Sequence, residues 1–229
     1  MYFYGIDSTY IMLVLPALIF SLWAQAKVNS TFSKFSTVSN KRGITGRDVA
    51  EKILHANGIY DVSIEHISGN LSDHFDPRTK VIRLSDSVYS STSVAAIGVA
   101  AHETGHAIQH NVGYVPIKLR NLVLPVAQIG STIAVPLVLL GLFFSYVLVD
   151  FGIILFAATV LFQLVTLPVE FNASRRAIVT LDEMMILDSD ELSKSKKVLS
   201  AAAMTYVASA AVGIANLLRL LSIAGRRRD

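Results

Sequence analysis

Residues 121–170 read NLVLPVAQIG STIAVPLVLL GLFFSYVLVD FGIILFAATV LFQLVTLPVE, and this stretch decides the fold class. Within it only Asp150 and the final Glu170 carry a charge, and none of the chain's 20 Lys and Arg residues lies there. A bilayer core about 30 Å thick is crossed by a helix of about 20 apolar residues. The stretch therefore predicts two membrane-spanning helices, at about Leu122–Phe144 and Val147–Leu167, which a short connection near Asp150 joins into a hairpin.

The composition agrees with a membrane protein. Of 229 residues, 52% are hydrophobic and only 16% are charged, against about 25% charged in a typical soluble domain. This balance excludes a disordered chain, a collagen, a coiled coil and a nucleic-acid binder. Cysteine is absent, so a transition-metal site in this chain has to use His, Asp and Glu.

A third apolar stretch, Tyr10–Ala26, is predicted to be an uncleaved anchor, because basic residues follow it at Lys27 and Lys34 rather than precede it. The positive-inside rule then places the N-terminus and the hairpin loop outside and the polar segments in the cytoplasm. Leu199–Ile223 is ambiguous. A fourth crossing would carry Arg226–Arg228 outside, so a helix that packs on the polar part without crossing is slightly favoured.

The polar segment is expected to hold a small α+β domain. Thr45 precedes a helical pattern that ends at Asn57-Gly58, and short strand patterns follow at 61–67, 71–75 and 80–84. A helix is predicted at Val94–His110. We therefore expect a mostly helical α+β membrane protein with a small sheet, divided into an anchor (1–27), a cytoplasmic catalytic part (28–120), a hairpin (121–169) and a C-terminal helical part (170–229).

The chemistry of the chain is concentrated in His102-Glu103-Thr104-Gly105-His106, an HExxH motif. On a helix the two histidines lie one turn apart on the same face, so both imidazoles can reach one metal ion. Glu103 points in a neighbouring direction and can act as a general base. Zinc fits this set because it binds imidazole and carboxylate ligands and lowers the pKa of bound water to about 7.

A third protein ligand is needed, and Glu170 is the preferred candidate over His55, His66 and His74. It is the first charged residue after the hairpin, on the side of the membrane to which the hairpin returns the chain. His110 continues the histidine face by one more turn, but three histidines spread over about 12 Å of a straight helix cannot converge on one ion. His110 is instead expected to be structural or to support a ligand.

Three segments together resemble a known family: 71–85, 96–109 and 167–177, which reads LPVEFNASRRA. They are similar to the YugP-type neutral zinc metallopeptidases of bacterial membranes, and more remotely to HtpX-type gluzincins. The resemblance implies a multi-pass protein of the bacterial cell membrane. It also implies that His102, His106 and Glu170 are the ligands of one Zn²⁺ and that Glu103 is the general base. In the HtpX-type site an Asp commonly follows the ligand Glu by four residues, and here that position is Ser174.

The expected activity is hydrolysis of peptide bonds by a zinc-activated water, with peptide or membrane-associated protein substrates and, by analogy with HtpX-type enzymes, a role in membrane protein quality control. Candidates for substrate or oxyanion binding are His74, Arg175 and Tyr206, with His110 also able to donate. An edge strand in 69–76 could hold an extended substrate. Two other functions remain open: a prenyl-protein-type endoprotease, and a non-catalytic membrane scaffold that retains a zinc site.

Overall fold

The computed structural model of the chain describes residues 7–225. Arg226–Arg228, used above to judge membrane topology, lie outside the described residues. The described part forms two compact units, each built from separated segments of the chain. The first comprises 1–25, 118–168 and 204–229, and the second comprises 26–117 and 169–203. The anchor, catalytic part, hairpin and C-terminal part predicted from sequence follow one another along the chain. Each compact unit instead combines residues from more than one of these four segments.

Four helices are long and apolar enough to cross a membrane: Tyr10–Ser36, Val115–Phe144, Tyr146–Glu183 and Ser189–Gly225. The first consists of a π-helical turn, η1 (Tyr10–Val14), continued by α1 (Leu15–Ser36). The other three are α4, α5 and α6. The structure confirms the predicted fold class, a mostly helical membrane protein with a small sheet. The helix that the sequence left ambiguous, α6, is as long and apolar as the length and composition criteria for a membrane span require.

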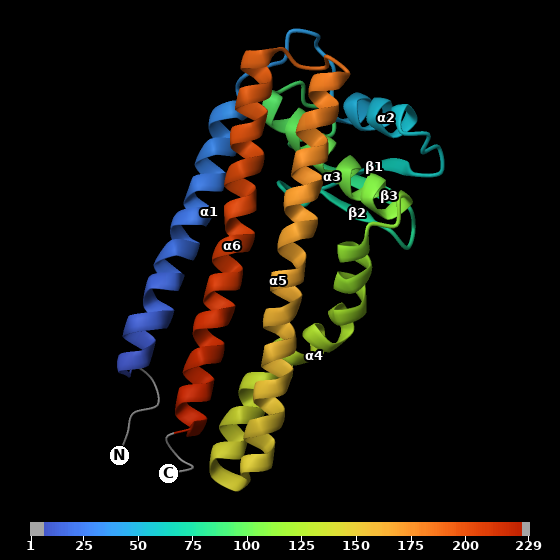
Figure 1. Cartoon of the computed structure of the whole chain (residues 1–229). Helices are drawn as coiled ribbons and strands as arrows, with labels where there is room; N and C mark the ends of the chain where they lie inside the picture. The colour runs from blue at the N-terminus through green and yellow to red at the C-terminus, as the bar shows by residue number, and fades with distance from the viewer. Residues whose placement is uncertain (1–6, 226–229) are drawn as a thin grey trace. The chain divides into compact units, whose positions relative to one another are not determined.

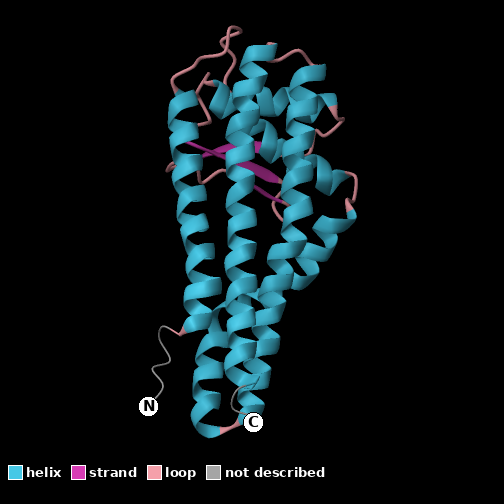
Figure 2. Cartoon of the chain, turned by 60° about the vertical axis from the view of Figure 1, so that its left-hand side comes forward, coloured by secondary structure: helices cyan, strands magenta, loops and turns pink. Residues whose placement is uncertain are grey.

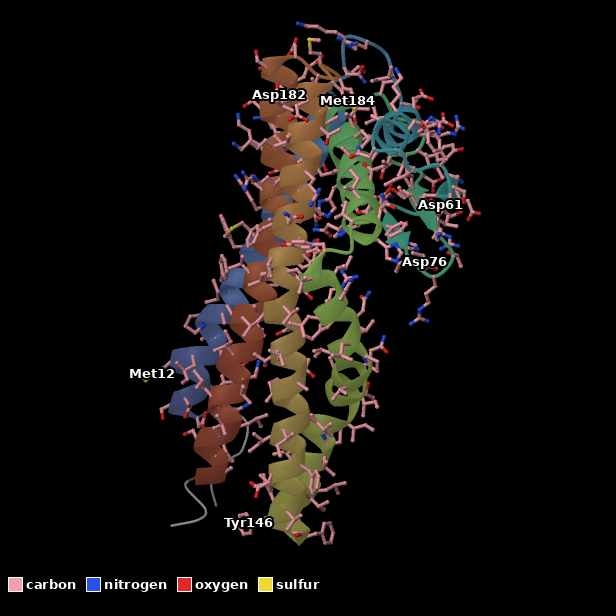
Figure 3. The ribbon with its side chains drawn as sticks, turned by 45° about the vertical axis from the view of Figure 1, so that its right-hand side comes forward. Met12, Asp61, Asp76, Tyr146, Asp182 and Met184 are labelled. Carbon is pink, nitrogen blue, oxygen red and sulfur yellow. The ribbon has the colours of Figure 1, made fainter. Side chains whose placement is uncertain are left out.

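The first unit contains the hairpin. Tyr146 lies at the turn that joins α4 to α5 (Figure 3). Close packing between the two helices depends on small residues: a methyl group on Gly152 would lie 2.6 Å from the Val138 side chain. Near the turn, Val138 and Val149 form one buried cluster with Ala224, close to the end of α6. The C-terminal end of α6 therefore packs beside the turn of the hairpin.

The same end of α6 contacts the start of the first helix. The Arg219 guanidinium lies 3.5 Å from the Asp7 carboxylate and 5.1 Å from the centre of the Tyr10 ring. Charged groups within membrane helices are costly unless they are paired. The end of α6 therefore packs beside the start of the first helix within the first unit, and α6 is among the four helices that are long and apolar enough to cross a membrane.

The second unit is the α+β part. Its helix α2 (Gly46–Ala56) begins with a capping box, in which the Thr45 hydroxyl accepts from the Asp48 N–H and the Asp48 side chain accepts from the Thr45 N–H. The three strands, β1 (Ser63–Ile67), β2 (His74–Asp76) and β3 (Val81–Ser85), form one small sheet (Figure 2).

The strand order of this sheet is β1-β3-β2. The central strand β3 is parallel to β1 and antiparallel to β2, which leaves β2 at an edge. α3 (Val94–Asn111) begins at Ser93, whose hydroxyl accepts from the Ala96 N–H, and it is buried along most of its length. It runs beside the part of α5 that belongs to this unit (Figure 1). Apolar side chains from α2, β3, α3 and α5 fill a single core, among them Val49, Ile53, Ile82, Leu84, Ile97 and Leu181.

Candidate metal centre

The two histidines of the HExxH motif lie on buried turns of α3. Their Nε2 atoms are 3.2 Å apart, and the side chains are only 14% and 11% exposed. Glu170, on α5, directs its Oε2 atom at both of them, 3.3 Å from His102 Nε2 and 3.6 Å from His106 Nε2. All three ligand atoms lie within 4.8 Å of one another. The structure thus brings together three residues that the sequence named as candidate ligands.

These spacings fit a tetrahedral metal ion. Protein ligands bind zinc at about 2.0–2.2 Å, so two ligands at a tetrahedral angle are roughly 3.3–3.6 Å apart. The three distances between the Nε2 and Oε2 atoms, 3.2, 3.3 and 3.6 Å, lie in or next to that interval. The other corner of the tetrahedron has no ligand among His, Asp and Glu of the described chain. A site with three protein ligands is typical of catalytic rather than structural zinc.

Gln109, which the sequence analysis missed, fixes the proton of His106. Its side-chain N–H donates to the Val169 carbonyl oxygen at 2.8 Å and to Asn172 Oδ1 at 3.0 Å, so its Oε1 faces His106 Nδ1 as an acceptor at 3.1 Å. His106 therefore keeps a proton on Nδ1, so its Nε2 is available to a cation when the imidazole is neutral and donates to Glu170 when the imidazolium forms. Orientation of this kind is what a ligand histidine requires.

Ser174 contacts the other histidine. Its hydroxyl oxygen lies 3.1 Å from His102 Nδ1 and can accept the proton there. The position where the resemblance to HtpX-type sites would place an Asp is thus occupied by a neutral group that contacts His102. Two imidazole lone pairs and a carboxylate oxygen then face one another, an arrangement that a divalent cation would stabilise.

The carboxylates around the histidines attract positive charge. Burial alone would lower the pKa of His106, but hydrogen bonding to Glu170 and the charges of Glu103 and Glu170 outweigh it, so the pKa lies above its usual value. Glu103 is itself only 8% exposed. A buried site with two carboxylates has a negative potential, which favours a cation.

Gly105 allows α3 and α5 to approach closely enough for this site to form. A methyl group on Gly105 would lie 2.7 Å from the carbonyl oxygen of Ala173, a contact that real side chains avoid. Ala173 follows Glu170 by three residues on α5. The glycine within the HExxH motif is therefore needed for packing, and this role explains a residue to which the sequence analysis gave none.

The remaining candidate residues lie as follows. His110 packs its ring against Phe75 of β2, with ring centres 5.9 Å apart. His74 is exposed on β2, where its Nδ1 lies 2.8 Å from the Ser72 carbonyl oxygen. Arg175 is exposed on α5. Tyr206 belongs to the first unit, where it lines a cavity between membrane helices.

Comparisons with known proteins agree with this site. A family model described as "Putative neutral zinc metallopeptidase" matches residues 10–225. The chain is 48% identical to "Putative membrane protease YugP" of Bacillus subtilis (strain 168) over 222 residues, which cover 96% of this chain and 98% of the relative. No solved structure matches the chain. Since the family model covers nearly the whole chain and the relative aligns over almost its full length, this protein belongs to the family described as "Putative neutral zinc metallopeptidase".

Proposed function

We propose that this protein is an integral-membrane endopeptidase in which His102, His106 and Glu170 hold one zinc ion and Glu103 is the general base. The observation that carries the proposal is the spacing of the three ligand atoms, 3.2–3.6 Å, with no fourth His, Asp or Glu grouped with them in the described part of the chain. When bound, zinc would polarise the scissile carbonyl and lower the pKa of a bound water molecule.

The chain's own residues supply the proton transfers. Glu103 follows His102 directly on α3, so its carboxylate is held at the edge of the site rather than in the ligand set. There it takes a proton from the attacking water and passes it to the nitrogen of the leaving amine. Gln109 keeps His106 in the tautomer that presents Nε2, and Ser174 can accept from His102 Nδ1 so that its Nε2 is presented as well.

We further propose that the active site lies on the cytoplasmic side. The support comes from the basic residues, all of which, up to Lys197, fall in segments that this orientation places inside. A role in membrane protein quality control accords with such an orientation, and peptides or membrane-associated proteins are the expected substrates.

The test compares Glu103→Gln with a matched control, Glu183→Gln, which changes an exposed carboxylate at the end of α5. Each purified protein is assayed for bound zinc and for hydrolysis of a fluorescent unfolded protein in detergent. Glu103→Gln should retain zinc and lose activity by roughly 10²–10⁴-fold, because it removes the general base. Glu183→Gln should match the wild type.

Four results would contradict the proposal. Wild-type protein that lacks zinc would favour a scaffold, and so would zinc-loaded wild type that hydrolyses no substrate. Activity confined to lipidated peptides would indicate a prenyl-protein-type endoprotease. Full activity of Glu103→Gln would remove Glu103 as the base.

A further inference from the structure

Arg176 lies on α5 beyond the candidate ligand Glu170, and it is partly buried. Its Nε–H donates to Asn172 Oδ1 at 2.8 Å, one turn earlier on the same helix. The same oxygen accepts from Gln109 Nε2 of α3 at 3.0 Å. Asn172 Oδ1 therefore joins Arg176 to the carboxamide that faces His106 Nδ1 at 3.1 Å.

The charge of Arg176 is not used in an ion pair with any carboxylate of the described residues 7–225. What the guanidinium provides is direction, because it has several donors and no acceptor. A side-chain carboxamide has an oxygen at one corner and an NH2 group at the other, and it can turn to exchange the two. Beside Arg176 only one orientation of Asn172 is favourable, the one that presents Oδ1.

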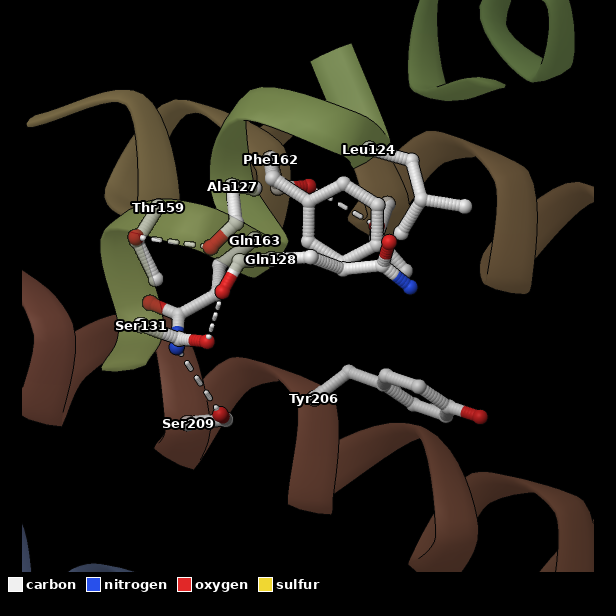
Figure 4. Close-up of a pocket in the computed structure, with 10 residues that line it drawn as sticks. Leu124, Ala127, Gln128, Ser131, Thr159, Phe162, Gln163, Tyr206 and Ser209 are labelled. Atoms are coloured by element: carbon white, nitrogen blue, oxygen red, sulfur yellow. Dashed lines mark hydrogen bonds between the residues drawn. The ribbon is translucent and has the colours of Figure 1, made fainter. Parts of the chain in front are cut away.

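Gln163, in the first unit, lacks a partner of this kind. Its Nε2 lies 3.3 Å from Ser209 Oγ (Figure 4), and its Oε1 accepts no hydrogen bond from residues 7–225. A hydroxyl both donates and accepts, so Ser209 could bond to either end of the carboxamide. The orientation of Gln163 is thus not fixed by its partner, whereas that of Asn172 is.

Asn172 in turn decides how Gln109 can lie. Gln109 Nε2 donates to two oxygens, the Val169 carbonyl at 2.8 Å and Asn172 Oδ1 at 3.0 Å. If Asn172 turned, its NH2 group would face that of Gln109, and one of the two hydrogen bonds would be lost. A turned Gln109 could bond to Asn172 again, but it would lose its bond to Val169. Arg176 removes this competition because it prevents the first turn.

The orientation of Gln109 matters for His106. When a cation occupies Nε2 of this histidine, the imidazole keeps its proton on Nδ1 and needs an acceptor there. Gln109 Oε1 is that acceptor, at 3.1 Å. A turned Gln109 would present its NH2 group instead. Two donors would then face each other between two buried side chains, which is costly.

We propose that Arg176 is a positioning residue of the metal centre. Through Asn172 it keeps Gln109 turned so that the carboxamide oxygen accepts from the histidine Nδ1. The inference deepens the proposed peptidase function and rests on its ligand set. It requires a group at position 176 that only donates, so Arg176→Lys should keep the arrangement. Arg176→Gln should lose it, because its Nε2 has the same reach as the arginine Nε but its Oε1 is an acceptor.

The test follows the His106 Nδ1 proton by proton–nitrogen correlation NMR of full-length protein with isotope-labelled histidine in detergent. Its exchange with solvent is measured in zinc-loaded protein and in metal-free protein at mildly acidic pH, where both ring nitrogens are protonated. Arg176→Gln and the similarly shaped Arg176→Met should speed exchange by about tenfold, the effect of about one hydrogen bond. Zinc affinity in a chelator titration should fall by a similar factor. Arg176→Lys should match the parent, and so should Arg175→Met, which changes the exposed arginine next to it.

Asn172→Asp supplies a second test, because both oxygens of a carboxylate are acceptors and need no arginine to orient them. Added to Arg176→Met, it should restore slow exchange of the His106 proton, which it could not do if the arginine acted only by packing. Slow exchange in folded Arg176→Met and Arg176→Gln would overturn the proposal, and so would fast exchange in Arg176→Lys or failure of the rescue. A parent that binds no zinc would contradict the peptidase proposal instead, and the metal-free spectra would still decide the role of Arg176.

Discussion

The Cα atom of Gly105 packs directly on the backbone of Ala173, so that an added methyl group would lie 2.7 Å from the Ala173 carbonyl oxygen. This contact sets how closely α3 approaches α5, and hence how closely the histidines approach Glu170. The metal centre therefore depends on a residue that is not a ligand and has no polar group.

Gly105→Ala should accordingly weaken zinc binding by separating the two helices. We expect a loss of stability of about 1–3 kcal/mol from overpacking, together with lower zinc content after dialysis. The measurements are elemental analysis and thermal unfolding in detergent. Gly225→Ala is the control, because a methyl group there contacts nothing within 4 Å. Full zinc occupancy in both variants would show that α5 can shift away from the added methyl group without weakening zinc binding.

Gln109→Leu should lower zinc affinity by about 10–100-fold, the usual effect of removing a group that orients a ligand histidine. The change removes the acceptor for His106 Nδ1 and also the hydrogen bond to Val169. A chelator competition titration measures the affinity. The control is His110→Ala. His110 is the next residue along the chain, but its ring packs on Phe75, so this variant should bind zinc as the wild type does. The opposite ranking of the two variants would contradict the role given to Gln109.

Ser174 is expected to support His102 as the aspartate of HtpX-type sites does. Ser174→Ala removes the acceptor that lies 3.1 Å from His102 Nδ1 and should weaken zinc binding, again by about 10–100-fold. Ser174→Asp keeps an acceptor and adds a negative charge, so it should bind zinc at least as tightly as the wild type. The same chelator titration applies. An alanine variant indistinguishable from the wild type would mean that His102 needs no partner there.

The packing of α6 predicts that the C-terminal end lies on the same side of the membrane as the hairpin turn. Because the chain has no cysteine, single cysteines report topology cleanly. A membrane-impermeant maleimide should label Ser145→Cys and Gly225→Cys in intact cells, and Ala56→Cys only after permeabilisation. Labelling of Gly225→Cys together with Ala56→Cys would instead support a helix that does not cross.

The sequence predicted those parts of the molecule that have local signals. Thr45 indicated the start of α2, and the predicted helix at Val94–His110 and the three strand patterns lie within a few residues of α3 and the observed strands. The sequence predicted a membrane span that ends at about Leu167 and a separate helical part from residue 170 onward, whereas α5 runs without a break from Tyr146 to Glu183.

The support for the ligands has no local signal at all. Gln109 bonds to a carbonyl 60 residues away along the chain, a contact that only the packing of α3 on α5 creates. The role of Gly105 is equally invisible in sequence, because its neighbour is a backbone atom of a distant helix. The signal that existed was the spacing: Gln109 follows His106 by three residues and so lies on the same helical face.

The hairpin between the histidines and Glu170 also has a consequence for biosynthesis. A growing polypeptide that has emerged only as far as α3 possesses two of the three groups around the metal position, and the last arrives after both hydrophobic segments have been synthesised. Competence to cut other proteins would thus begin only once the chain has been delivered to its membrane, and nascent fragments would be harmless to the cell that makes them.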